Sequence, residues 1–342
     1  MRTILITGGA GFIGSNFIHH LLANHDYQVI NLDNLTYAGN LDNLRDIEDD
    51  PRYRFVHGDI CDREQVAPLM AEADAVVSFA AETHVDRSLE DPGAFIQTDV
   101  YGTFVLLEAA RQADIERFLH ISTDEVYGQS LADQRFTEES PFRPRSPDAA
   151  SKAGGELQCR AFRETYGLPI VIARPANNVG PCQHPEKAVP LFITNALEDE
   201  PLPVYGQGQQ VRDRLYVDDH CEALDLLLHE GELGEAYNIG ADNERTNMEV
   251  AETILELLEK PKSLIRFVED RTGHDQRYSL DSQKMRGLGW SPRHDFTATI
   301  EQTVAWYREH REWWEKVKSG QYRAYYQRMY GRRLAEAKPY EG

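Results

Sequence analysis

A glycine-rich turn directly after the first apolar segment constrains this chain more than any other feature of its sequence. Ile4–Ile6 reads as a β-strand, Gly8, Gly11 and Gly14 follow it, and the pattern over Phe17–Leu22 predicts a helix. Glycines at this spacing allow a tight turn, close approach of the backbone to a pyrophosphate, and close packing of the helix on the strand. The free N–H groups at the start of such a helix attract anions.

The second predicted strand, Val29–Leu32, is followed by Asp33, which is placed to accept hydrogen bonds from an adenosine ribose. Because the same carboxylate would repel a 2′-phosphate, the pattern favours NAD over NADP as the cofactor. The alternative is an ordinary glycine turn with no ligand. The other predicted cofactor contacts are Phe12, Ile13, Asp59 and Ile60.

Strands and helices alternate through the first half of the chain. Further strands are predicted at 55–56, 75–79, 118–121 and 170–173, with a helix at 103–112 between two of them. This alternation is typical of βαβ units, so we expect an α/β fold with a doubly wound, Rossmann-like parallel sheet.

The pattern changes after residue 181, where proline and glycine become frequent. Helices are predicted at 220–229 and 248–258, and the aromatic tail at 300–330 has helical spacing typical of core packing. We therefore expect an NAD-binding domain over 1–180 and a smaller, mainly substrate-binding α/β domain over 181–342, with the chain crossing between the two.

The composition argues against several classes of partner. A net charge of −21 over 342 residues disfavours nucleic acid and anionic membrane surfaces. No apolar run is long enough to span a bilayer, and glycine comes too early for a signal peptide. Four scattered cysteines are typical of a cytoplasmic protein. No metal site is expected, because His84, His184 and His274 are too dispersed.

Polar clusters follow two predicted strands, at 80–88 and 122–128. Ligands of doubly wound folds bind beyond the carboxyl ends of the strands, so both clusters are placed for chemistry. The adjacent carboxyls of Asp124 and Glu125 can be driven to different pKa values, so that one serves as an acid and the other as a base. A solvated acidic turn is the alternative.

Eight segments carry distinctive motifs: Gly8–Ser15, Leu35–Leu41, Ala81–Ser88, Ile121–Gly128, Asn177–Pro181, Pro185–Lys187, Val211–His220 and Asp270–Asp275. Together they resemble the dTDP-glucose 4,6-dehydratase family of extended short-chain dehydrogenase/reductases, over nearly the whole chain. The resemblance implies a homodimer that binds NAD and a nucleotide-diphosphate sugar. The implied reaction is oxidation at C4 of the hexose, loss of water across C5–C6, and reduction at C6.

Residue roles follow from the same resemblance. Asp124 would protonate the departing 6-hydroxyl, Glu125 would remove the proton from C5, and Thr123 would hydrogen-bond the 4-oxygen. Arginines can make bidentate contacts with a diphosphate, although a surface salt bridge is the alternative for each of them. The implied substrate contacts are His84, Thr123, Asn177, Glu186, Lys187, Arg212, Asn247, Arg271 and His274.

The chain departs from the family at the catalytic base. Short-chain dehydrogenases carry Tyr-x-x-x-Lys, in which the lysine also binds the nicotinamide ribose; here Lys152 is in place but the tyrosine position is Asp148. We expect an i,i+4 pair between these two residues, which would keep Asp148 ionised and weaken it as a base. Asp99 stands where the family usually has Asn, and Gly154–Gly155 weakens the helix that carries Lys152.

Three explanations of Asp148 stay open at this point. The protein is a dehydratase in which Asp148, or a water that it holds, is the base. It is a diverged paralogue that binds NAD and a nucleotide sugar with little activity, or with the altered activity of an epimerase or decarboxylase. Or Asp148 was introduced by mutation. Tyr127 is a conceivable replacement phenol, although a tyrosine at that position more often has a structural packing role.

Overall fold

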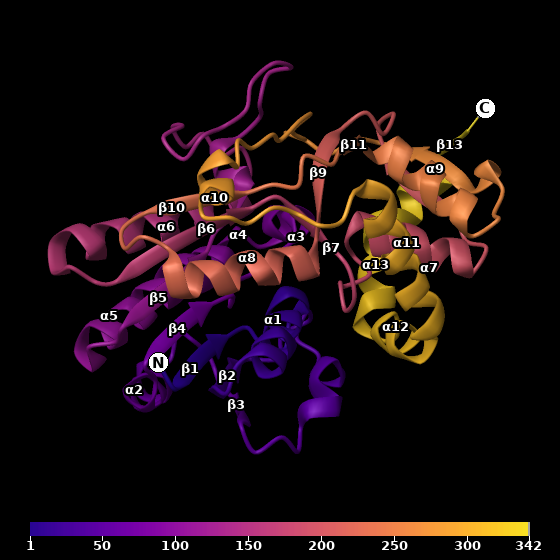
Figure 1. Ribbon diagram of the computed structural model, residues 1–342. Coiled ribbons are helices and arrows are strands. Elements are labelled where there is room, and N and C mark those ends of the chain that lie inside the picture. Colours follow the sequence, from indigo (N-terminus) through magenta and orange to yellow (C-terminus); the bar gives the residue numbers. More distant parts are fainter. Residues whose placement is uncertain (341–342) are drawn as a thin grey trace.

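Seven strands pair in parallel to form the central sheet of the computed structural model, which describes residues 1–340 (Figure 1). Their order across the sheet is β10-β6-β5-β4-β1-β2-β3, so β1 lies between β2 and β4 and the sheet winds outward from it in both directions. This order confirms the predicted doubly wound α/β fold. The strands are β1 (Thr3–Thr7), β2 (Gln28–Asp33), β3 (Tyr53–His57), β4 (Ala75–Ser78), β5 (Arg117–Ile121), β6 (Ile170–Pro175) and β10 (Ala236–Ile239).

Helices cover both faces of this sheet, which explains why its central strands are almost wholly apolar. Successive residues of a strand point to opposite faces, so Ile4 and Ile6 enter one core and Leu5 enters the other. The covering helices are α1 (Phe12–Asn24), α2 (Arg63–Glu72), α5 (Thr103–Ala113), α6 (Pro147–Tyr166) and α8 (Val217–Glu230).

The last strand of the sheet and one covering helix come from the second half of the chain. After β6 the chain leaves the sheet, and it returns as α8 and then as β10, which pairs in parallel with β6. Figure 1 shows α8 lying beside α1. Strand β10 was not predicted from the sequence, because its four residues Ala-Tyr-Asn-Ile do not form a continuous apolar run like that of β4.

A smaller unit, on the right of Figure 1, contains two three-stranded sheets and a group of helices. One sheet holds β7 (Asn177–Val179), β9 (Val211–Tyr216) and β11 (Glu244–Thr246); the other holds β8 (Leu202–Tyr205), β12 (Ile265–Val268) and β13 (Lys338–Pro339). Its helices are α7 (Ala188–Leu197), α9 (Asn247–Leu257), α11 (Phe296–Glu309), α12 (Arg311–Val317) and α13 (Gln321–Ala335).

The aromatic tail packs into the core of this unit, as predicted. Tyr307 and Trp314 are fully buried there, together with apolar residues of α7 and α9. The shorter helical segments are η1 (Leu41–Ile47), α3 (Val85–Glu90), α4 (Pro92–Phe95), the π-helix η2 (Ile96–Gly102), η3 (Asp124–Tyr127), η4 (Lys262–Leu264) and α10 (Gln283–Gly287). In the described part of the chain, 1–340, none of the helices is both long and apolar enough to cross a membrane.

The two glycines in α6 allow this helix to lie directly against the π-helix η2. A Cβ atom at Gly155 would lie 2.5 Å from the carbonyl oxygen of Asp99, and one at Gly154 would lie 2.8 Å from Val100 Cγ2. Short π-helical turns are frequent at functional sites, and this one presents Asp99 to α6. The glycines that weaken the helix therefore provide the space for a close contact.

We predict that Gly155→Ala lowers the free energy of unfolding by about 1–3 kcal/mol, because the new methyl group overlaps backbone that has no room to move. Urea unfolding followed by circular dichroism measures the change. Gly287→Ala is the matched control, since no atom lies within 4 Å of its added Cβ. Equal stability of the two variants would contradict the close contact.

Candidate active site

A cavity of about 480 Å³ lies at the carboxyl ends of the parallel strands and is lined by both the sheet and the smaller unit. It brings together the predicted cofactor contacts Gly8, Gly11, Phe12, Ile13, Gly14, Asp33, Asp59, Ile60 and Lys152. It also brings together the predicted substrate contacts His84, Thr123, Asn177, Glu186, Lys187, Arg212, Asn247, Arg271 and His274. Glu125 and Asp148 line it as well. Asp124 does not; it is buried between Thr123 and Glu125.

The glycine turn leaves its backbone open to the cavity. Gly8 has a φ of +73°, which favours glycine, and a Cβ at Gly14 would lie 2.4 Å from the Gly8 carbonyl oxygen. Gly11 is the N-cap of α1, so the N–H groups of Phe12 and Ile13 stand in the first turn, where the helix supplies no acceptors. Such a turn suits a pyrophosphate.

Asp33 ends β2 at the edge of the same cavity. Its carboxylate accepts the backbone N–H of Ala10 at 2.9 Å and that of Leu35 at 2.8 Å. Burial raises the pKa of Asp33, and these two hydrogen bonds oppose that rise. Each carboxylate oxygen keeps a free lone pair, so the side chain can also accept the hydroxyl groups of a ribose.

The expected pair between Asp148 and Lys152 is wrong, because Asp99 takes the ammonium group. Lys152 Nζ lies 2.8 Å from Asp99 Oδ2 and donates to the Glu82 carbonyl oxygen at 2.5 Å. Asp99 also accepts the Ser151 hydroxyl at 2.6 Å and the Glu82 N–H at 2.9 Å. Among the ion pairs of residues 1–340, none joins Asp148 to Lys152. Helical spacing could not reveal a competing carboxylate from η2.

The expected lowering of the Asp148 pKa is also wrong. Burial raises its pKa to about 7; Lys152 and Lys187 oppose this rise, whereas Glu125 and Asp99 add to it. The side chain is 8% exposed and lines the cavity. A carboxyl with a pKa near neutrality can hold or release a proton at the pH of a cell, which is the property required of a general base.

Asp124 and Glu125 stand in the first turn of η3, whose N-cap is Thr123. The Thr123 hydroxyl lies 3.2 Å from Asp124 Oδ1, and Oδ2 has no hydrogen-bond partner among the residues described. Burial and the neighbouring Glu125 raise the pKa of Asp124 to about 8. Asp124 therefore keeps its proton at neutral pH, as a general acid must, while Glu125 faces the cavity.

Tyr127 cannot replace the missing phenol. Its side chain is almost fully buried, and its hydroxyl bonds to Asn238 Oδ1 at 2.8 Å and to the Arg174 guanidinium. Burial raises its pKa to about 12, although Arg174 opposes the rise. The suggestion that Tyr127 supplies the base is therefore wrong, and the residue is structural.

Buried arginines line the other end of the cavity. Arg212 and Arg214 are two residues apart on β9 and therefore share one face of that strand. Arg214 donates to Asn247 Oδ1 at 2.7 Å, and burial lowers its pKa to about 9. Arg271 lies 3.2 Å from Asp86. Partly desolvated guanidinium groups at this spacing suit a diphosphate.

A strained turn at His84 and the half-buried Lys187 also line the cavity. His84 has a φ of +90°, a rare conformation for a residue with a side chain, and its Nε2 donates to the Glu186 carbonyl oxygen at 3.0 Å. Burial lowers its pKa well below the usual value, so the ring is neutral. Lys187 donates to the Thr83 hydroxyl at 2.9 Å, and Glu186 pairs with Arg87.

Several residues of the site were not predicted. Asp99 positions Lys152, Arg87 holds Glu186, and Arg214 and Tyr278 line the cavity beside Arg212. Alternation along β9 was a signal that could have identified Arg214. The departure of Asp99 from the family's usual Asn and the place of Arg87 in the polar cluster at 80–88 were further signals, whereas the sequence carries none for Tyr278.

Comparison with known proteins gives a consistent result. The family model described as GDP-mannose 4,6 dehydratase matches residues 5–303. The chain is 54% identical to the low-salt glycan biosynthesis protein Agl12 of Haloferax volcanii, over 89% of this chain and 98% of the relative. It is 49% identical to the dTDP-glucose 4,6-dehydratase of Neisseria meningitidis serogroup B, over 94% of this chain and 98% of the relative.

A solved structure is similar over most of the fold. It is DesIV, the dTDP-glucose 4,6-dehydratase of Streptomyces venezuelae, with NAD and TYD bound. Its TM-score is 0.91 and its identity 50%, and the match covers 93% of this chain and all of that one.

We predict that Asp148→Asn stabilises the protein at pH 8 by about 1–3 kcal/mol more than at pH 5. Between the ordinary pKa of Asp and about 7, the unfolded carboxyl is ionised but the folded one holds its proton, so its contribution to stability falls as pH rises. Asparagine does not titrate and escapes this loss. Urea unfolding at both pH values measures the difference, with Asp133→Asn, in an exposed loop, as the control. A difference equal to that of the control would contradict the raised pKa.

Proposed function

The chain belongs to the GDP-mannose 4,6-dehydratase family, and from this membership we propose that it is an NAD-dependent hydro-lyase that converts dTDP-glucose to dTDP-4-keto-6-deoxyglucose. One observation carries this proposal. A single cavity joins a dinucleotide-type glycine turn, the Glu125 carboxyl next to the buried Asp124, and arginines suited to a diphosphate.

The residues around the glycine turn fit NAD. The open N–H groups of Phe12 and Ile13 would hold the pyrophosphate, Asp33 the adenosine ribose, and Lys152 the nicotinamide ribose. When bound, NAD supplies hydride removal at C4 of the hexose and hydride return at C6. At the other end of the cavity, Arg212 and Arg271 would hold the substrate diphosphate.

The carboxyl pair supports dehydration over other reactions of this fold. Glu125, facing the cavity, takes the proton from C5 once C4 is a ketone. Asp124, protonated at neutral pH, gives its proton to the 6-hydroxyl, which leaves as water. A 4-epimerase needs no acid and base at C5–C6, so this pair favours the dehydratase.

Asp148 takes the place of the family's tyrosine as the base at the 4-hydroxyl. Its pKa near 7 allows it to accept a proton as the hydride departs. Asp99 is a positioning residue: it holds the Lys152 ammonium group in an ion pair and adds a negative charge that raises the pKa of Asp148. The two departures from the family at 99 and 148 therefore act together.

A homodimer is part of the same proposal. Apolar side chains on η2 and α6 are exposed, with Ile96 55% and Leu157 54% accessible, and these two elements lie against each other. Exposed apolar side chains on two neighbouring elements support an interface at this surface. A cytoplasmic location agrees with the four free thiols.

We predict that Asp148→Asn slows single-turnover reduction of bound NAD by dTDP-glucose about 10²–10⁴-fold, the usual effect of losing a general base. The rate in the unmodified protein should rise as pH increases through about 7, because Asp148 must lose its proton to act. In Asp99→Asn the rise in rate should occur at a lower pH, because the substitution removes a negative charge that raises the pKa of Asp148. Stopped-flow absorbance of the reduced nicotinamide follows each reaction.

The same measurement separates the explanations of Asp148. An Asp148→Asn variant as fast as the unmodified protein would assign the base elsewhere. Tight binding of dTDP-glucose with no reduction of NAD in the unmodified protein would make it a binding protein. If Asp148→Tyr is much faster than the unmodified protein, Asp148 is a poor substitute for the phenol.

We predict that Asp124→Asn and Glu125→Gln slow loss of the 6-hydroxyl about 10²–10⁴-fold while NAD is still reduced, because the first oxidation does not use these carboxyls. The alkali-induced absorbance of the 4-keto-6-deoxy product measures elimination. Glu139→Gln, in an exposed loop, is the control. Unchanged elimination in both variants would refute the assigned roles.

We predict that light scattering at micromolar concentration gives the mass of two chains, and that Leu157→Asp lowers it to one by placing a charge in the apolar interface. The control is Leu131→Asp, another exposed leucine, which lies in a loop outside η2 and α6. A monomeric unmodified protein would rule out the dimer.

A further inference from the structure

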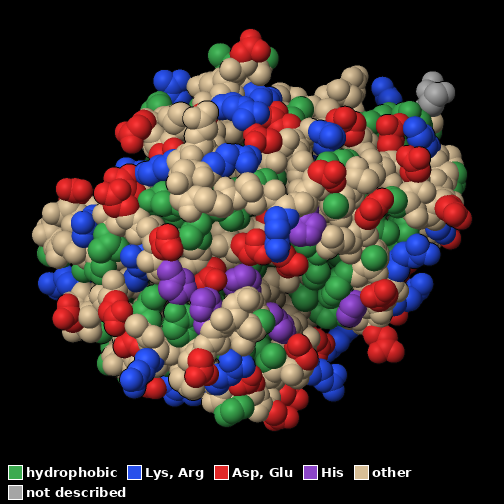
Figure 2. Space-filling model, viewed as in Figure 1, with side chains coloured by type: hydrophobic (Ala, Val, Ile, Leu, Met, Phe, Trp, Pro, Cys, Tyr) green, Lys and Arg blue, Asp and Glu red, His purple; other side chains and the backbone are tan. Residues whose placement is uncertain are grey.

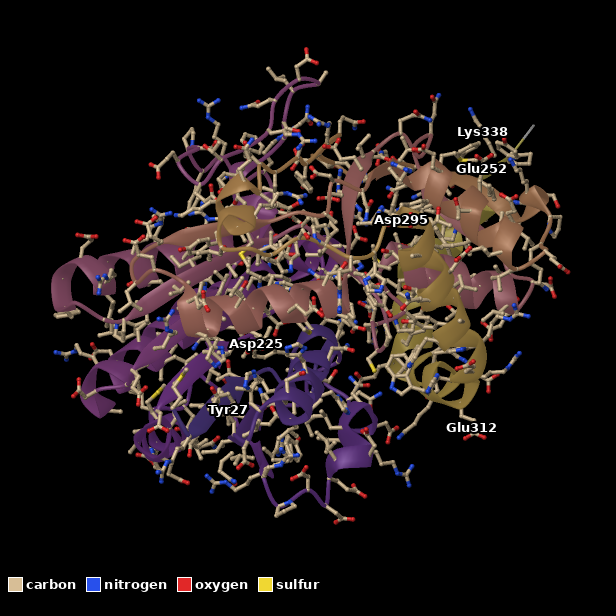
Figure 3. The ribbon with its side chains drawn as sticks, in the orientation of Figure 1. Tyr27, Asp225, Glu252, Asp295, Glu312 and Lys338 are labelled. Atoms are coloured by element: carbon tan, nitrogen blue, oxygen red, sulfur yellow. The ribbon has the colours of Figure 1, made fainter. Side chains whose placement is uncertain are left out.

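Three histidines lie around one aspartate, Asp225, near the C-terminal end of α1. This end of the helix is the one farther from the glycine turn. Asp225 belongs to α8, His20 to α1, His25 is the C-cap of α1, and His229 follows Asp225 by one helical turn. Figure 2 shows histidine side chains gathered over these two helices, and Figure 3 shows Asp225 on α8 with Tyr27 nearby. None of these residues lines the cavity described above.

The distances within this cluster are short. His25 Nε2 lies 2.9 Å from both carboxylate oxygens of Asp225, and His229 Nδ1 lies 3.2 Å from Asp225 Oδ1. One ligand atom from each of the three residues lies within 4.8 Å of the others. Two ligands of a tetrahedral zinc ion are about 3.3 Å apart, so a small inward or outward shift of side chains would bring these atoms to bonding positions.

We propose that His25, Asp225 and His229 form a binding site for Zn²⁺ or a similar divalent transition metal that links α1 to α8. Imidazole nitrogen and carboxylate oxygen are the ligands that zinc takes from such a set, and three protein ligands leave one position for water. The side chains are 19–31% exposed, so the ion has a route from solvent.

Neighbouring residues already orient these ligands. His20 Nε2 lies 3.1 Å from Asp225 Oδ2, and the Tyr27 hydroxyl lies 2.7 Å from His229 Nε2. When Nδ1 of His229 binds the metal, its proton moves to Nε2 and is donated to Tyr27. The hydrogen bond that Nδ1 now donates to the backbone carbonyl oxygen of Asp225, 2.7 Å away, is then lost, and the bond from Nε2 to Tyr27 takes its place. Hydrogen bonds of this kind fix the tautomer and orientation of ligating histidines.

The charge of the cluster favours a cation. Asp225 is the only carboxylate in contact with the rings of His20, His25 and His229 in the part of the chain described. Its oxygens lie 2.9–3.2 Å from the nearest nitrogen of each ring, so the one acidic group of the cluster stands at its centre.

Zinc titration of the untagged, EDTA-treated protein with NAD present tests this site. Isothermal titration calorimetry should give one zinc per chain. The melting temperature should rise by about 3 °C when the free zinc concentration is a hundred times the dissociation constant. Asp225→Asn and His229→Gln should each abolish this binding. Tyr27→Phe, which removes only the supporting hydrogen bond, should weaken it about 10-fold.

His310→Gln is the matched control, because the ring of His310 also bonds to a carbonyl oxygen one turn earlier in its own helix. It should bind zinc as the unmodified protein does. Co²⁺ adds a structural readout, since tetrahedral coordination without thiolate gives visible absorption and no sulfur-to-metal band. The proposal fails if no zinc binds, if zinc binds equally to Asp225→Asn and His229→Gln, or if the cobalt spectrum shows a cysteine ligand.

Discussion

Parallel pairing of β1 with β2 on one side and with β4 on the other brings the glycine turn, Asp33 and the polar segment after β4 to one edge of the sheet. The chain segments that follow β1 and β4 turn to opposite sides of the sheet, so a crevice opens beyond the carboxyl ends of these two strands. The glycine turn enters it from β1, and η3 enters it from β5. Residues that are more than a hundred positions apart in the chain thus share one cavity because strand ends meet at one edge.

Basic residues nearly balance the acidic ones along the lining of that cavity, although the chain as a whole is strongly negative. The chain carries a net charge of −21, yet Lys152, Lys187, Arg212, Arg214 and Arg271 all line the cavity. Most of these groups are paired with carboxylates or amides, which reduces the cost of burying them. The balance of charges explains how an acidic protein presents a local site suited to a phosphate-bearing ligand.

Much of this arrangement could be predicted from the sequence, because it depends on local patterns. The glycine turn, Asp33, the carboxyl pair and six of the seven sheet strands follow from spacing and alternation. The error at Asp148 has a different origin. Helical spacing placed Lys152 within reach, but the decisive partner, Asp99, comes from a π-helical turn that no periodicity predicts. Burial then reversed the direction of the pKa shift, and burial of a single carboxyl is a property of the whole fold.

The packing of α1 against α8 fixes the distance between the first residues of the two helices. Helix α1 begins at the glycine turn, and α8 begins directly after β9, the strand that carries Arg212 and Arg214. Their packing therefore helps to fix the distance between the glycine turn and the two arginines of β9. A substitution that shifts one helix along the other would change that distance with every residue of the cavity still in place. The geometry of the cavity therefore depends on the side chains between α1 and α8 as well as on the residues that line the cavity.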